Sequence, residues 1–178
     1  TTDINGLAPA LYLGDAHYLL PYSRDPAFLG QFLDLCRHEN IGLIIPLIDP
    51  DLPVLAGNVE AIESTGAQVL VSPERVIDIC RNKKKTYGFL KKNGFPTPQI
   101  FGEEQAGKHG FPLIIKPLDG SASVNVFKIN DSDELKFFAR YVPNAVIQEF
   151  INGDEFTTDV FSDWSGNPIA AIPRRRLK

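Results

Sequence analysis

Residues 113–126 read Leu-Ile-Ile-Lys-Pro-Leu-Asp-Gly-Ser-Ala-Ser-Val-Asn-Val. The apolar residues Leu113–Ile115 predict a strand that ends on one lysine, Lys116. A turn of small residues, Gly120–Ser123, follows, and Val124–Ile129 predicts a second strand. A lysine and the free backbone N–H groups of such a turn can together hold the phosphates of a nucleotide.

A second stretch, residues 146–155, reads Val-Ile-Gln-Glu-Phe-Ile-Asn-Gly-Asp-Glu and completes the pattern. Between the two stretches, Ser132–Tyr141 has the spacing of an amphipathic helix. The apolar run Ala145–Ile147 then predicts a strand that leads into Gln148 and Glu149, where polar groups at a strand end can contact a base. Together the two stretches indicate an enzyme that uses ATP.

The residues before this region alternate between expected strands and helices. Helices are predicted at Asp25–Asn40 and Leu52–Thr65, and strands at Leu11–Leu20, Gly42–Asp49 and Gln68–Val71. The run from residue 42 to residue 49 is mostly apolar, which is typical of a strand buried on both faces of a parallel sheet. The alternation predicts a parallel, helix-covered sheet with right-handed crossovers.

After Pro73 the rhythm of the sequence changes. Two helices and two antiparallel strands are expected there: Glu74–Cys80, Lys83–Asn93, Phe156–Phe161 and Ile169–Ile172. An extended linker, Phe95–Pro98, leads from the second helix into the next part of the chain. We therefore expect a domain boundary near residue 73, with domains at residues 1–73 and 74–178.

Two acidic residues follow the strand that is predicted at Gly42–Asp49. In a parallel sheet, functional residues collect at the carboxyl ends of the strands, so Asp49 and Asp51 can bind a cationic or hydroxylated ligand. They can also cap the helix that follows. The general preference for Asp at helix starts favours the cap.

The composition argues against several classes of protein. The 178 residues have a net charge of −4, which gives no general attraction for nucleic acid or an anionic membrane. No apolar run is long enough to span a bilayer. Only two cysteines, Cys36 and Cys80, are present, which argues against a disulfide framework and favours the cytoplasm.

Four segments of the chain occur in a characteristic order and spacing. They are Arg81-Asn82-Lys83-Lys84-Lys85-Thr86, Gly94–Pro98, Phe111–Ser123 and Gln148–Glu155. This series resembles the ATP-grasp superfamily, and within it the proteins similar to the carbamoyl-phosphate synthase large subunit. The resemblance implies a two-lobed α+β ATP-grasp fold over most of residues 74–178, after an α/β domain with a Rossmann-like parallel sheet. Both ends of the chain are expected to be incomplete, because it lacks methionine and stops directly after a predicted strand.

The resemblance also implies a set of ATP-binding residues. Lys83 would reach the phosphates from the start of its helix, and Lys116 would contact the phosphates nearest the adenine. The flexible loop over the β- and γ-phosphates matches Gly120, Ser121, Ala122, Ser123 and Val124. The hinge that reads the adenine amino edge matches Gln148, Glu149, Phe150 and Ile151.

Further roles follow from the same resemblance. Glu155 would hold the ribose hydroxyls, and Arg174 or Arg176 would lie near the transferred phosphoryl group as catalytic residues. The acids that bind Mg²⁺ are implied beyond the equivalent of Lys178, so no metal ligand is assigned in this chain.

Each of these residues also has a plainer explanation. Lys116 fits a lysine that extends from a strand end into solvent, although the neighbouring turn favours the phosphate role. Lys83 fits a solvated helix face, Gln148 and Glu149 fit polar groups at a strand end, and Arg174–Arg176 fits a basic surface cluster. The family often has glycine where this chain has Ala122 and Asn125, which predicts a less mobile loop.

The function implied by the resemblance is that of an ATP-dependent ligase. ATP, with Mg²⁺, would phosphorylate a carboxylate or bicarbonate, and an amine or ammonia would displace the phosphate. No nucleic-acid or membrane partner is expected, and the resemblance leaves a homodimer open. Two other functions remain as alternatives: a non-catalytic ATP- or ADP-binding protein, and a dinucleotide enzyme, although no Gly-x-Gly-x-x-Gly follows a predicted strand.

Overall fold

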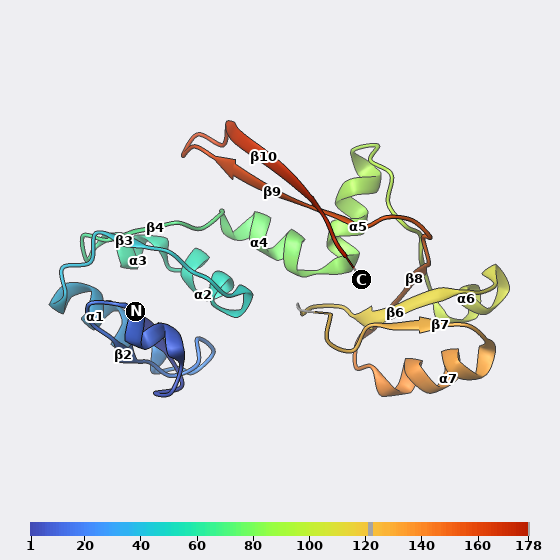
Figure 1. Ribbon diagram of the computed structural model, residues 1–178, viewed down its shortest axis with the longest axis horizontal. Coiled ribbons are helices and arrows are strands. Elements are labelled where there is room, and N and C mark those ends of the chain that lie inside the picture. Colours follow the sequence, from blue (N-terminus) through green and yellow to red (C-terminus); the bar gives the residue numbers. More distant parts are fainter. Residues whose placement is uncertain (121–122, 178) are drawn as a thin grey trace.

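A computed structural model describes residues 1–120 and 123–177 of the protein. Along the chain the elements form an N-terminal part, a central pair of helices, a small sheet with two helices, and a C-terminal hairpin (Figure 1). The N-terminal elements are β1 (Thr2–Asp3), η1 (Pro9–Leu13), β2 (Tyr18–Leu19), α1 (Phe28–His38), β3 (Leu43–Ile44), η2 (Asp49–Asp51), α2 (Leu52–Ala56), α3 (Val59–Glu63) and β4 (Gln68–Val69). The later elements are α4 (Glu74–Arg81), α5 (Lys83–Lys92), β5 (Ile100–Phe101), α6 (Glu103–His109), β6 (Leu113–Pro117), β7 (Phe127–Ile129), α7 (Ser132–Tyr141), β8 (Ala145–Glu149), β9 (Phe156–Ser162) and β10 (Pro168–Arg175).

The small sheet has the strand order β5-β8-β6-β7, and all of its neighbouring strands are antiparallel. The face packed in the core with α6 and α7 carries four apolar side chains: Leu113, Ile115, Ile129 and Ile147. Because side chains alternate along a strand, Ile114 and Lys116 point to the opposite face. The packing of the apolar face against α6 and α7 therefore places Lys116 on the face that these helices do not cover.

Two helices of this region begin on polar side chains that satisfy their first N–H groups. The Asn82 side chain accepts hydrogen bonds from Lys84 N–H (3.0 Å) and Lys85 N–H (3.1 Å), which caps α5. The Asp131 carboxylate caps α7 in the same way. At its other end, α5 is followed by Gly94 with a φ of +76°. The predicted helices at Lys83–Asn93 and Ser132–Tyr141 are thus confirmed.

The N-terminal part differs from the sequence prediction. Two separate parallel pairs form, β1 with β2 and β3 with β4, where we predicted one sheet with a strand at Gly42–Asp49 buried on both faces. That prediction is wrong: β3 covers only two residues, and Leu47 is 87% exposed. Pro46 lacks the N–H that a continued ladder needs, and within the described residues β3 pairs on one edge only.

Other N-terminal elements are shorter than predicted. The helix expected over Leu52–Thr65 is split into α2 and α3, because Gly57 and Asn58 form helices poorly and the Asn58 side chain donates to Val54 O (2.7 Å). Most of the strand expected at Leu11–Leu20 is η1 and loop, and only β2 is extended. A core still forms from α1, α2, α3, β4 and the residues next to β2 and β4: Leu20, Phe28, Phe32, Cys36, Leu55, Ile62, Ala67 and Val69.

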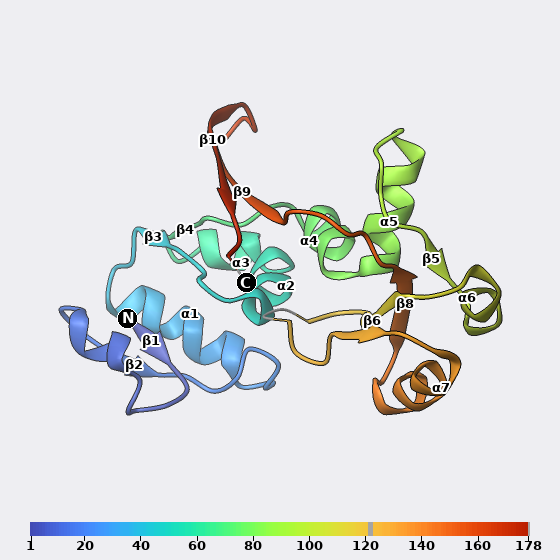
Figure 2. The same cartoon turned by 45° about the vertical axis from the view of Figure 1, so that its right-hand side comes forward.

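The hairpin of β9 and β10 confirms the two antiparallel strands that the sequence predicts. It projects away from the rest of the chain in both orientations (Figures 1 and 2). Every residue of both strands is exposed. Among the helices of the described ranges, none combines the length and apolar character needed to cross a membrane.

The sheet core predicts a difference between neighbouring isoleucines. Replacing Ile115, which is fully buried, with alanine should lower the free energy of unfolding by about 2–5 kcal/mol, because it leaves a cavity under α6 and α7. Ile114→Ala, on the opposite face, is the matched control and should cost less. Chemical denaturation of both variants measures the difference, and equal losses would contradict the assignment of faces.

Candidate functional site

Two lysines from different elements approach each other beside the end of β6. Lys83 is the first residue of α5, and its backbone N–H donates to Leu118 O (3.0 Å). The Lys83 ammonium donates to Gly120 O (3.3 Å). The N–H of Leu118 in turn donates to Asn144 O (3.0 Å), just before β8. The segment after Lys116 is therefore held between α5 and β8.

Partial burial lowers the pKa values of both lysines, and a neighbouring charge lowers that of Lys116 further. Burial lowers the pKa of Lys116, and the nearby charge of Lys83 lowers it further. Burial also lowers the pKa of Lys83, while the neighbouring Asp119 carboxylate opposes that change. Across residues 1–120 and 123–177, neither ammonium forms a salt bridge with an acidic side chain. The site is thus suited to an anion with more than one negative charge.

The start of α5 contributes side chains to this site, and its first N–H groups are already used. Lys83 N–H bonds Leu118 O, and Lys84 and Lys85 N–H bond the Asn82 side chain. An anion here would therefore be bound by the two ammonium groups, with little help from the helix terminus.

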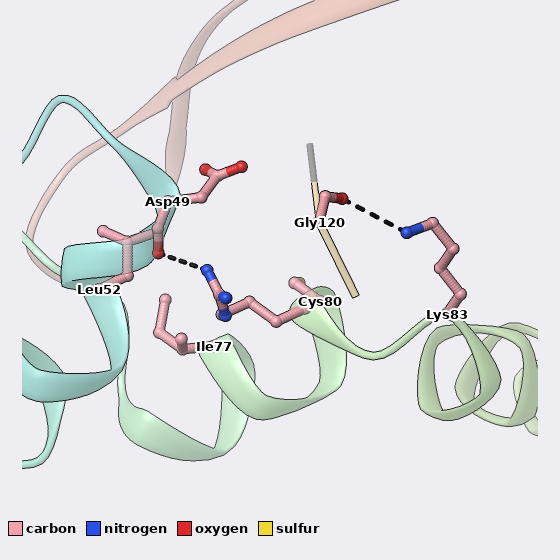
Figure 3. A pocket seen from close by; sticks show the side chains of 7 residues that line it. Asp49, Leu52, Ile77, Cys80, Lys83 and Gly120 are labelled. Carbon is pink, nitrogen blue, oxygen red and sulfur yellow. Dashed lines mark hydrogen bonds between the residues drawn. The ribbon is translucent and has the colours of Figure 1, made fainter. Parts of the chain in front are cut away.

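A hollow of about 190 Å³ opens next to Lys83, between η2 and α2 on one side and α4 on the other (Figure 3). Its walls are formed by Asp49, Leu52, Ile77, Cys80, Arg81, Lys83 and Gly120. The Arg81 guanidinium donates to the backbone O of Asp49 across this hollow. Arg81 has no predicted role, and its one signal in the sequence is its position in the segment Arg81–Thr86.

The loop after β6 keeps a backbone that normally favours glycine. Gly120 has a φ of +106°, and Ser123 and Asn125 have φ values of +56° and +55°. Asparagine tolerates this left-handed conformation better than most residues, so Asn125 can stand at a position where the family often has glycine. Val124 is exposed, whereas Ser121 and Ala122 lie outside the described residues.

Two of the expected hinge residues form hydrogen bonds with the segment just before β5. The Gln148 side chain donates to Pro98 O (3.2 Å), and the Glu149 carboxylate accepts from Gln99 N–H (3.2 Å). The hydroxyl of Tyr87, on α5, donates to the side-chain oxygen of Gln99 (2.8 Å). This network was not predicted, because Gln99 and Tyr87 stand in no motif.

The last two hinge residues differ in their surroundings. The Lys128 ammonium lies 4.3 Å from the centre of the Phe150 ring, which indicates a cation–π contact. Ile151 is 58% exposed. The adenine role of the four residues from 148 to 151 stays a prediction.

The residues expected near the ribose and the transferred phosphoryl group lie on or beside the hairpin. Arg174 forms a two-pronged ion pair with Asp159 (2.7 and 3.1 Å), and Arg176 pairs with Glu155 (2.7 Å). Asp159 raises the pKa of Arg174. Exposed pairs of this kind contribute little energy and exchange readily for other partners. The roles of Arg174, Arg176 and Glu155 therefore stay predictions.

No metal centre is visible in the part of the chain that the structure describes. No group of three or more His, Cys, Asp or Glu side chains is placed there to hold a metal ion.

The sequence matches two family models. A model described as an ATP-grasp domain matches residues 80–178, and one described as a PylC-like N-terminal domain matches residues 1–70. The chain belongs to the ATP-grasp family.

Several curated ATP-grasp relatives are similar in sequence. The phosphoribosylamine–glycine ligase of Pyrococcus furiosus is 29% identical over 95% of this chain and 45% of its own length. The carbamoyl-phosphate synthase of Methanobrevibacter smithii is 27% identical over 97% of this chain and 47% of its own. The D-alanine–D-alanine ligase of Bacillus anthracis is 29% identical over 80% and 53%. The chain spans about half the length of these relatives.

Solved structures confirm the ATP-grasp fold. Biotin carboxylase from Campylobacter jejuni has a TM-score of 0.71 at 14% identity, covering 95% of this chain and 43% of that one. An L-amino acid ligase from Bacillus licheniformis has a TM-score of 0.67 at 24% identity, covering 92% and 43%. At these identities the likeness concerns the fold alone.

The lowered pKa of Lys116 predicts that its charge costs stability when no anion is bound. Lys116→Met should raise the free energy of unfolding at neutral pH. The advantage should shrink as the pH rises, because the folded wild type releases its proton before the unfolded chain does, at about pH 10.4. Chemical denaturation between pH 7 and pH 10 measures the trend. Lys84→Met, at an exposed position, is the control, and a destabilised Lys116→Met would contradict the prediction.

Proposed function

We propose that this chain forms the nucleotide-binding part of an ATP-dependent ligase. The observation that carries the proposal is the approach of Lys83 and Lys116, two partly buried cations without a salt-bridge partner among the described residues. Holding two such charges together costs free energy, and a bound polyphosphate would recover it. The division into domains at residues 1–73 and 74–178 is part of the same proposal.

The chemistry of such a ligase requires cations more than any other group. In the first step a carboxylate or bicarbonate oxygen attacks the γ-phosphorus of ATP, and the bond from that phosphorus to the ADP oxygen breaks. Nucleophile and phosphate are both anions, so Lys83 and Lys116 would reduce their repulsion and position the phosphates. An amine or ammonia then attacks the acyl carbon, loses a proton, and expels inorganic phosphate.

The names of the relatives support this reaction class. They are ligases of glycine and of D-alanine and a carbamoyl-phosphate synthase, and solved neighbours are titled as complexes with ATP or with MgADP and bicarbonate. We therefore propose ATP with Mg²⁺, a carboxylate or bicarbonate, and an amine or ammonia as the ligands of the whole protein. One neighbour is titled as a dimer, which keeps a homodimer within the proposal. The free cysteines Cys36 and Cys80 fit a cytoplasmic location.

The alternative of a non-catalytic nucleotide-binding protein loses part of its support. It rested on the replacement of glycine at Asn125 and at Ala122, which lies outside the described residues. The backbone of Asn125 is left-handed in the structure, so this substitution preserves the loop conformation. We therefore favour the ATP-dependent ligase over the non-catalytic nucleotide-binding protein.

Thermal unfolding of the full-length protein tests the nucleotide site. At 100 times its dissociation constant, ATP should stabilise the wild type by about 2.7 kcal/mol, and NAD should not. Lys83→Met and Lys116→Met should lose most of this stabilisation, while Lys84→Met should keep it. Measurements with and without Mg²⁺ separate the contribution of the metal. If saturating ATP left the wild-type unfolding temperature unchanged, the proposed site would be refuted.

A further inference from the structure

We propose that the hollow beside Lys83 binds the carboxylate substrate, and that this substrate is a small α-amino acid. The inference rests on the proposed ligase function and identifies the substrate that the reaction activates. The substrate carboxylate would face Lys83 and Arg81, and its ammonium would face Asp49. Its side chain would lie against Leu52 and Ile77.

The Asp49 carboxylate is available because the structural role expected for it is absent. The sequence favoured Asp49 or Asp51 as a helix cap, and that prediction is wrong: neither η2 nor α2 has a side-chain cap. Ile48 and Asp51 occupy the N-cap positions of η2 and α2, and neither side chain accepts a hydrogen bond from a backbone N–H of its helix. Within the described residues the Asp49 carboxylate has no salt-bridge partner, and Asp49 is one of the residues that line the hollow (Figure 3).

The turn that carries Asp49 is held in place by two long-range hydrogen bonds. The buried Ser23 hydroxyl donates to Pro50 O (3.3 Å), and the Arg81 guanidinium donates to Asp49 O. Ser23 is the buried polar residue of the described core. These bonds hold the backbone carbonyl groups of Asp49 and Pro50, so the turn presents the Asp49 carboxylate at a defined place.

Two cations, Arg81 and Lys83, also line the hollow. Arg81 has five N–H donors and uses one of them on Asp49 O, and no acidic side chain of the described ranges pairs with it. Lys83 lines the same hollow and also belongs to the proposed phosphate site. A carboxylate bound by these two cations would therefore lie next to the phosphates, where the acyl phosphate must form.

The distribution of charge favours an amino acid over bicarbonate. Bicarbonate has no cationic group, so the Asp49 carboxylate would face an anion without compensation. An α-amino acid carries its ammonium one carbon from its carboxylate and matches a hollow whose lining includes both negative and positive side chains. The volume of about 190 Å³ and the apolar surfaces of Leu52 and Ile77 favour a small or apolar side chain.

Release of ADP and phosphate by the full-length protein tests the inference. The acids compared are glycine, L-alanine, D-alanine, propionate and bicarbonate, each with hydroxylamine to trap an acyl phosphate. An amino acid should drive turnover, whereas propionate and bicarbonate should not. Asp49→Asn should raise the KM for the amino acid roughly 10- to 100-fold, because it removes the partner of the ammonium. Asp51→Asn, in the same turn, is the matched control and should leave the KM unchanged.

Alkylation of Cys80 measures occupancy without turnover. Cys80 lines the hollow and is exposed, whereas Cys36 is buried, so iodoacetamide should modify Cys80 first. In the presence of ATP, the amino acid should slow this reaction in the wild type but much less in Asp49→Asn. Turnover with bicarbonate or propionate, or an amino-acid KM that Asp49→Asn does not change, would overturn the inference. If ATP stabilised the protein but no amino acid drove turnover or slowed alkylation, only the amino-acid inference would be overturned. If ATP did not stabilise the protein, the proposed ligase function would be overturned as well.

Discussion

The site depends on the hydrogen bond between the Lys83 N–H and Leu118 O. This bond joins the start of α5 to the segment after β6, and Leu118 N–H joins the same segment to Asn144. Because of these contacts, two ammonium groups stay close although the charge of Lys83 lowers the pKa of Lys116. The packed core of the small sheet supplies the rigidity, since Leu113 and Ile115 fix the position of β6.

The sequence predicted best the elements that local signals define. The helix at Ser132–Tyr141 has an Asp cap and a clear apolar stripe, and the hairpin has turn residues between two apolar runs. The run at Gly42–Asp49 was interpreted wrongly, because apolar character favours a strand but does not specify its partners. Pro46 lacks an N–H, and in the described part of the chain β3 has β4 as its single neighbour, so it covers only Leu43 and Ile44. Pairing of this kind is a property of the whole fold.

The candidate site likewise contains residues that local sequence signals placed and residues that they did not. Lys83 and Lys116 could be placed from the sequence because each lies at the end of a recognisable element. The contact of Arg81 with Asp49 joins residues 32 positions apart, and no local pattern predicts it. The capping role of Asp49 depends on the backbone angles and side-chain direction at one residue, and residue type alone does not decide these. A wrong prediction at Asp49 thus identified a carboxylate that neither caps a helix nor forms a salt bridge within residues 1–120 and 123–177.

Helix α5 connects the two ends of the proposed nucleotide site. Lys83 and Tyr87 are four residues apart, so both side chains lie on one side of the helix. The first contacts Gly120 in the phosphate loop, and the second contacts Gln99, whose backbone N–H bonds the Glu149 carboxylate at the hinge. About one turn of helix, with a rise of about 6 Å over four residues, therefore separates the lysine proposed to bind phosphate from the tyrosine that contacts the proposed hinge. Because Asn82 caps the start of α5 and Gly94 follows its end, this spacing is set by a helix with a defined start and end.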